Sequence, residues 1–122
     1  MNNKKITAIV IVIIIAIIVI ALAFFWLKQS AVNKTYLYVS NECSHCKIVE
    51  EFIDSNGIKD KVQFEIKEVS ANQANAQELI SKAVKCGINQ NEVGVPMLWA
   101  DSKCIVGDQS IIDFFKIKAG IK

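Results

Sequence analysis

Arginine is absent from this chain of 122 residues, and histidine and proline occur once each, as His45 and Pro96. Surfaces that bind nucleic acid normally need a basic stripe and use arginine heavily. Residues 28–122 carry 12 lysines and 12 acidic residues, so they have no formal net charge, and the total of +2 comes from Lys4 and Lys5. A nucleic-acid partner is therefore not expected. Internal repeats are also absent, which argues against a repeat architecture.

Charge is absent from residues 6–27, an apolar run in which Thr7 is the only clearly polar side chain. A run of about 20 apolar residues matches the hydrocarbon core of a bilayer. We expect a transmembrane signal anchor over residues 6–27, a cytosolic stub over residues 1–5 and a linker over residues 28–33. A buried helix of a soluble protein is a poor alternative, because the rest of the chain is too small to surround it.

A cleaved signal peptide is the competing interpretation of this run. Ala21-Leu22-Ala23 has the small-x-small form of a cleavage site, and cleavage near Ala23 would leave a secreted domain. The apolar run continues to Leu27, and Trp26 suits a membrane interface, which favours the anchor. The slight excess of positive charge before the run predicts a cytosolic N-terminus and a domain on the extracytoplasmic side. Four cysteines fit such an oxidising compartment.

Residues 34–122 are enough for one compact domain with its own core. Period-two patterns and β-branched residues predict strands, and apolar residues at helical spacing predict helices. The predicted strands cover residues 35–39, 62–67, 95–100 and 103–106, and the predicted helices cover residues 43–55, 72–85 and 108–120, the last capped by Asp108. A parallel first pair of strands and a hairpin turn at Asp101-Ser102 complete the prediction. The result is a β-α-β-α-β-β-α order with a mixed four-stranded sheet and flanking helices.

Cys43 and Cys46 lie where the first predicted strand joins its helix. Two intervening residues let the sulfur atoms meet across the first helical turn. The helix dipole and the free backbone N–H groups favour the thiolate of Cys43, so Cys43 is predicted to attack and the more buried Cys46 to resolve the mixed disulfide. Zinc sites also use such pairs, but the place at a strand–helix junction favours redox chemistry over zinc or an inert disulfide.

His45 and Pro96 are further candidates for the site. His45 lies inside the cysteine motif and is predicted to stabilise the Cys43 thiolate, which would raise the reduction potential above that of a strongly reducing thioredoxin-type couple. The alternative is a solvated loop residue without a role. Pro96 follows Val95 at a strand start, where the residue types allow both a trans entry into the strand and a cis bond.

Taken in order, these features resemble the thioredoxin superfamily, and the size is closest to that of glutaredoxins. The resemblance rests on the first strand, Cys43-Ser44-His45-Cys46, the helix, Val95-Pro96, the hairpin and Gly107-Asp108, and it covers residues 34–117. It implies a thioredoxin-like fold and an enzyme that exchanges thiols and disulfides. The position of the histidine is similar to that in the motif of periplasmic disulfide-forming enzymes of this superfamily.

The resemblance also implies roles for single residues. Cys43 would be the nucleophile and Cys46 the resolving thiol. The Val95–Pro96 bond would be cis and would pack against the disulfide, and the backbone of Val95 would pair with an extended substrate segment. Gly107 and Asp108 would also line the substrate site.

Departures from the glutaredoxin pattern count against glutathione as a substrate. Val106-Gly107 stands where glutaredoxins usually have two glycines, and Ser44 and His45 stand where they usually have a proline and an aromatic residue. We therefore expect a monomer that acts on protein thiols or disulfides with an unidentified redox partner and without a cofactor. The residues do not indicate whether it oxidises, reduces or isomerises disulfides.

Cys86 and Cys104 are the remaining cysteines. They are candidates for a structural disulfide, for two unpaired core residues, or for a relay of electrons to the first pair. A metal site made by all four cysteines would need a chance convergence in space, so no metal is predicted. The predicted function is a membrane-anchored thiol–disulfide oxidoreductase. The alternative is a membrane-tethered module that binds copper(I) or zinc through Cys43 and Cys46.

Overall fold

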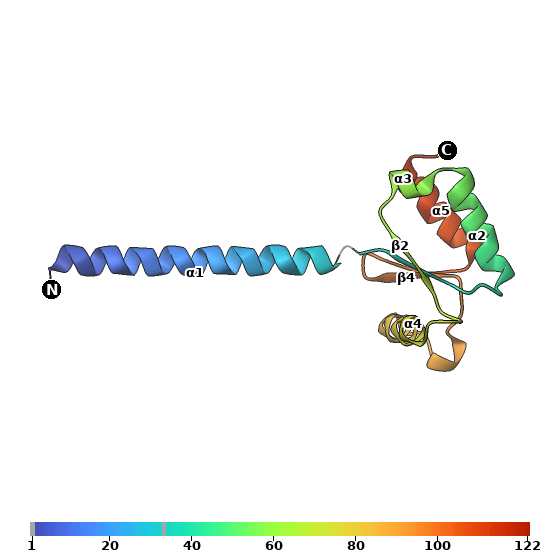
Figure 1. Cartoon of the computed structure of the whole chain (residues 1–122), viewed down its shortest axis with the longest axis horizontal. Coiled ribbons are helices and arrows are strands. Elements are labelled where there is room, and N and C mark those ends of the chain that lie inside the picture. The colour runs from blue at the N-terminus through green and yellow to red at the C-terminus, as the bar shows by residue number, and fades with distance from the viewer. Residues whose placement is uncertain (1, 33) are drawn as a thin grey trace. The chain divides into compact units, whose positions relative to one another are not determined.

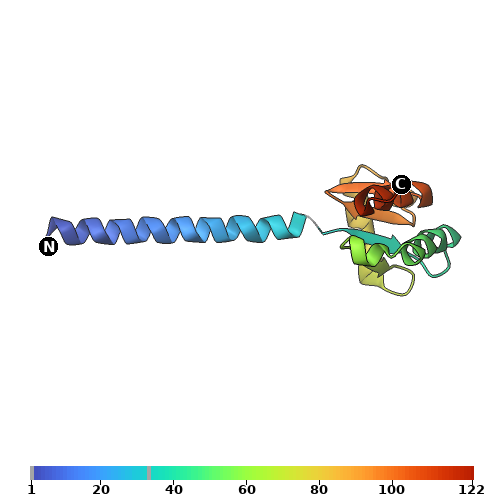
Figure 2. The ribbon, with the colours of Figure 1, turned by 90° about the horizontal axis from the view of Figure 1, so that it is seen from above.

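The computed structural model describes residues 2–32 and 34–122, so Met1 of the expected stub and Asn33 of the expected linker lie outside the described residues. The chain divides into two compact units, Met1–Asn33 and Lys34–Lys122. The first unit holds helix α1, Asn3–Val32, drawn as one uninterrupted helix in Figures 1 and 2. Helix α1 continues over residues 28–32, where a linker was expected, because this stretch holds neither proline nor glycine to end it.

Within α1, the candidate span Asn3–Leu27 contains an 18-residue window with a mean hydropathy of 3.6, and none of that window is buried. This stretch is long and apolar enough to cross a membrane. An N-terminal signal sequence also meets these criteria of length and composition, so the helix is a candidate for either role.

The second unit is built on a mixed sheet of four strands in the order β2-β1-β3-β4. The strands are β1 (Tyr36–Val39), β2 (Glu65–Glu68), β3 (Met97–Ala100) and β4 (Lys103–Val106). Strand β1 runs parallel to β2 and antiparallel to β3, and β3 runs antiparallel to β4. The predicted mixed four-stranded sheet is confirmed.

Helices cover both faces of this sheet. Figure 1 shows α2 (Ser44–Ser55), α3 (Ile58–Lys61) and α5 (Asp108–Ala119) on one face and α4 (Gln73–Lys85) on the other, and a short 3-10 helix, η1 (Gln90–Glu92), precedes β3. Figure 2 shows the green α2 and the red α5 near one another, and the two helices pack together.

Two cores follow from the alternation of side chains along the strands. In β1, Leu37 and Val39 pack with the buried residues of α2 and α5, among them Cys46. Tyr38 points to the opposite face and packs with Leu79 of α4 and with residues of β3. The Cys43–Cys46 motif therefore belongs to the α2–α5 face of the sheet.

Three local details refine the predicted elements. Strand β2 begins at Glu65 rather than at residue 62, because its parallel partner β1 begins at Tyr36, which pairs with Glu65. At the hairpin, Asp101 and Ser102 have φ of 49° and 61°, so the predicted tight turn is confirmed. Gly107, and not Asp108, is the N-cap of α5. The predicted cap was therefore one residue late, and the Asp108 carboxylate instead accepts the backbone N–H of Gln109 within the first turn of α5.

Candidate active site

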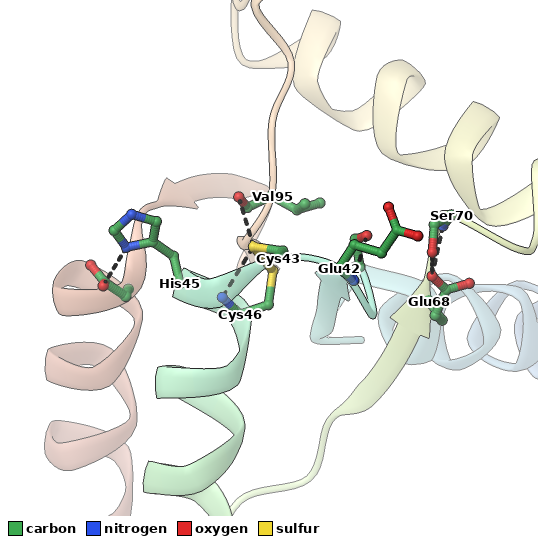
Figure 3. The surroundings of a disulfide bond; sticks show 9 residues. Glu42, Cys43, His45, Cys46, Glu68, Ser70 and Val95 are labelled. Atoms are coloured by element: carbon green, nitrogen blue, oxygen red, sulfur yellow. Dashed lines mark hydrogen bonds and ion pairs between the residues drawn. A yellow bond between two sulfur atoms is a disulfide. The ribbon is translucent and has the colours of Figure 1, made fainter.

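Cys43 is the N-cap of α2, with extended backbone angles (φ −94°, ψ 114°), and α2 begins at the next residue. Its sulfur accepts a hydrogen bond from the backbone N–H of Cys46 at 3.1 Å (Figure 3). This N–H belongs to the first turn of the helix, where backbone donors have no partner within the helix. The same donor and the helix dipole stabilise a negative sulfur when the disulfide is open.

The two cysteines of the motif differ in exposure. Cys43 is half-buried and Cys46 is fully buried in the α2–α5 core. Their Cα atoms lie 5.2 Å apart and their sulfur atoms form a disulfide. A substrate sulfur can therefore approach Cys43, whereas Cys46 is reached only from Cys43. This is the arrangement that an attacking and a resolving thiol require.

The loop before β3 lies against Cys43. The Cys43 sulfur is 3.6 Å from the carbonyl oxygen of Val95 (Figure 3), and the Val95–Pro96 peptide bond is cis. The backbone N–H of Gly107 donates to the carbonyl oxygen of Pro96 at 3.2 Å. The loop before β3 and the start of α5 are thus joined beside the motif, although they lie more than 50 residues from Cys43 in the chain.

The side chains of His45 and Asp108 meet between the starts of α2 and α5. The His45 Nδ1 lies 2.8 Å from the Asp108 Oδ2, and the two side chains are 69% and 28% exposed. The hydrogen bond from His45, followed by that from the Gln109 backbone N–H, lowers the pKa of the Asp108 carboxyl below its ordinary value. The pair holds the imidazole beside the N-terminus of α2, within the motif.

Cys86 and Cys104 form a second disulfide, with Cα atoms 6.1 Å apart. This distance is within the range that a disulfide allows. Cys104 packs in the α4-side core, whereas Cys43 and Cys46 pack in the core on the other face of the sheet. An electron relay through sulfur contact would need the two pairs on one face. The same separation excludes a single metal site made by all four cysteines.

Among the described residues, no group of three or more histidine, cysteine or acidic side chains is arranged to hold a metal ion. A tetrahedral zinc site in a protein usually takes four such ligands, and a catalytic one takes three. Cys43 and Cys46, with His45 turned toward Asp108, supply two.

The glutaredoxin family model matches residues 36–105, which is more than half of the chain. The chain belongs to the glutaredoxin family. No curated protein matches the sequence. The match includes both motif cysteines, Val95 and Pro96, and it confirms the resemblance to the thioredoxin superfamily. A glutaredoxin domain with this cysteine pair supports a thiol oxidoreductase.

The pairing of His45 with Asp108 is the feature of the site that the sequence did not predict. Both residues were expected near the site, His45 as a neighbour of the thiolate and Asp108 as a cap that faces the substrate. Their separation of 63 residues carries no periodicity, and the family match ends before Asp108. Only their places at two neighbouring helix starts could have suggested the contact.

Proposed function

We propose that the protein is a membrane-anchored thiol–disulfide oxidoreductase that exchanges disulfides with protein substrates through Cys43 and Cys46. The observation that carries the proposal is the Cys43 sulfur, which caps α2, accepts the Cys46 N–H and stays half-exposed while its partner sulfur is buried. Family membership supports the same chemistry.

The reductive direction runs in two steps. The Cys43 thiolate attacks a substrate disulfide, so that one substrate sulfur leaves as a thiol and the other stays bound to Cys43. The Cys46 thiol then loses its proton and attacks the Cys43 sulfur, which releases the second substrate thiol and forms the Cys43–Cys46 disulfide. Two electrons pass to the substrate, and the reverse sequence oxidises a dithiol.

His45 is proposed to favour the reduced form of the pair, because a cationic imidazole beside the helix N-terminus stabilises the thiolate. The contact with Asp108 supports this role, because it holds the imidazole beside the start of α2. A stabilised thiolate makes the disulfide form the stronger oxidant.

The proposed substrates are proteins. Val95 presents its backbone carbonyl beside Cys43, and an extended segment can pair with the backbone of such a residue. Val106, which stands in place of a second glycine, has an exposed side chain at the end of β4. A protein disulfide and a glutathione-bearing peptide offered to the same enzyme should therefore differ in rate, with the protein disulfide faster.

The anchor is proposed to be α1, with the N-terminus in the cytosol and the domain outside. The apolar stretch Asn3–Leu27 supports the anchor, and Lys4 and Lys5 before it support the orientation. The mass of the mature protein separates the two interpretations of α1, because signal cleavage near Ala23 would remove most of the helix.

Turnover of a protein disulfide by the full chain in lipid nanodiscs tests the chemistry. Cys43→Ser should abolish turnover, and Cys46→Ser should accumulate the mixed disulfide, because Cys43 can still attack. Full turnover by Cys43→Ser would refute the proposal. As a matched control, the double variant Cys86→Ala with Cys104→Ala also removes one disulfide and should keep turnover.

A further inference from the structure

Lysines of the unit Lys34–Lys122 gather at the end of the sheet where β1 begins. Nine of its eleven lysines lie on segments that meet there, and we term this surface the basic end. These residues are Lys34, Lys59, Lys61, Lys82, Lys85, Lys103, Lys116, Lys118 and Lys122.

Contacts between distant segments establish that they share this end. The Lys82 ammonium of α4 lies 5.7 Å from the ring centroid of Tyr36 at the start of β1 and 4.5 Å from that of Trp99 in β3. The Lys118 Nζ of α5 lies 3.5 Å from the Asp101 carboxylate in the β3–β4 turn. Helix α3 packs against α5, and Figure 1 shows α3 beside the C-terminus of the chain.

The charge of the unit is divided unevenly between its ends. The nine lysines of the basic end face only four acidic residues there, which gives a formal charge of +5. The four are Asp54, Asp60, Glu65 and Asp101. The rest of the unit has two lysines and eight acidic residues, which gives −6. Of these two lysines, Lys67 reaches the Tyr36 ring at 4.2 Å but pairs with Glu78 at 2.5 Å, so this pair adds no net charge to either end. Glu42 and Glu68 lie at the end of the sheet that holds Cys43, opposite the basic end (Figure 3).

An exposed apolar side chain stands within the basic end. Ile117 is 79% exposed, the highest value among the exposed large hydrophobic residues of this unit, and it lies between Lys116 and Lys118. An apolar side chain flanked by lysines is the pattern of segments that lie at a membrane surface, where the apolar group enters the headgroup region and the ammonium groups meet lipid phosphates.

We propose that the basic end binds the anionic headgroups of the membrane in which α1 is anchored, and this inference rests on the anchoring part of the proposed function. The chain enters the domain at Lys34, within this end, and only residues 28–33 separate Lys34 from the apolar stretch of α1. This short separation keeps the lysines near the bilayer surface. The absence of arginine argues against a nucleic acid as the occupant of the surface. Cys43 follows the opposite end of β1, so this orientation leaves the reactive sulfur facing away from the lipid.

Lysine acylation tests the orientation. The full chain is placed in nanodiscs of phosphatidylcholine alone or with phosphatidylglycerol, and the labelling rate of each lysine is read by mass spectrometry. Lys116, Lys118 and Lys122 should label at least about fivefold more slowly in the anionic discs, the factor expected for one lysine held at an anionic surface. The difference should vanish at about 0.5 M salt, because the Debye length shrinks. Lys47, beside the active motif, should label equally in both discs.

Equal labelling of the basic end in both discs at low salt would overturn the inference. A charge-matched pair of variants adds a second test with Lys61 and Lys103 as reporters. Replacing Lys116, Lys118 and Lys122 by glutamine should weaken the protection of the reporters, and replacing the same three by arginine should keep it; equal protection in both variants would also overturn it. Retention of the chain on neutral discs at high salt tests the anchor by itself.

Discussion

Loss of the Cys86–Cys104 disulfide should destabilise the domain without stopping turnover. The bond ties the end of α4 to β4 across a separation of 18 residues. Helix α4 buries only Leu79 and Ala83, so the bond is a principal attachment of this helix to the sheet. Closing a loop of this length in the unfolded chain corresponds to about 3 kcal/mol at room temperature. For a domain of this size, that lowers the melting temperature by roughly 15 °C.

Calorimetry of the full chain in nanodiscs measures this effect on the double variant Cys86→Ala with Cys104→Ala. The matched control, Cys43→Ser with Cys46→Ser, opens a bond across a separation of only 3 residues. For this control, the same loop-closure calculation gives about half the loss of stability. A melting temperature within about 3 °C of the parent protein would refute the argument from loop closure. Loss of turnover in a folded double alanine variant would contradict a purely structural role of this disulfide.

Three further predictions concern the start of α5 and its partner. His45→Ala should lower the reduction potential of the Cys43–Cys46 pair by about 30 mV, which is a tenfold change in its equilibrium constant. Lys47→Ala, which removes the cation that follows the motif, should leave this potential nearly unchanged. Equal shifts in the two variants would contradict a specific role of His45. Gly107→Ala should lower the free energy of unfolding, measured by chemical denaturation, by about 1–3 kcal/mol, because Gly107 has φ of +92°. Gly94→Ala, where the added methyl group meets open space, should leave this free energy nearly unchanged. Because the pKa of Asp108 is lowered in the folded state, its contribution to stability is present above the ordinary value of 3.8 and is lost as the pH falls through the lower folded value. The free energies of unfolding of Asp108→Asn and the parent protein, measured by denaturation at a series of pH values, should therefore converge in acid. A constant difference between them at all pH values would contradict this prediction.

Much of the domain was predictable because its signals are local. The place of Cys43 at a helix start follows from a strand pattern that ends before it and a helical pattern that begins after it, and the structure has Cys43 as the N-cap of α2. The buried face of α5 followed from the spacing of Ile111, Ile112 and Phe115, all of which are buried. The Asp101-Ser102 turn followed from the two short strands that flank it.

Other features depend on contacts that no local pattern records. The start of β2 is set by its partner strand, because β1 begins at Tyr36 and pairs this residue with Glu65. Helix α3 was not predicted, because a one-turn helix is too short to show a period. Ile66 stays 36% exposed despite its alternation with polar neighbours, since β2 pairs only with β1 and lies at the sheet edge. Periodicity predicts which face a residue shares, but the neighbouring elements decide whether that face is covered.

The sequence by itself determined the apolar N-terminal run, the cysteine motif at a strand–helix junction and the order of the main strands and helices along the chain, because each depends on residues close together in the chain. Only the tertiary structure decided that His45 meets Asp108, that Cys86 bonds Cys104 on the opposite face from Cys43 and that nine lysines share one end. These are meetings of segments separated by tens of residues, and the packing of helices on the sheet brings them together.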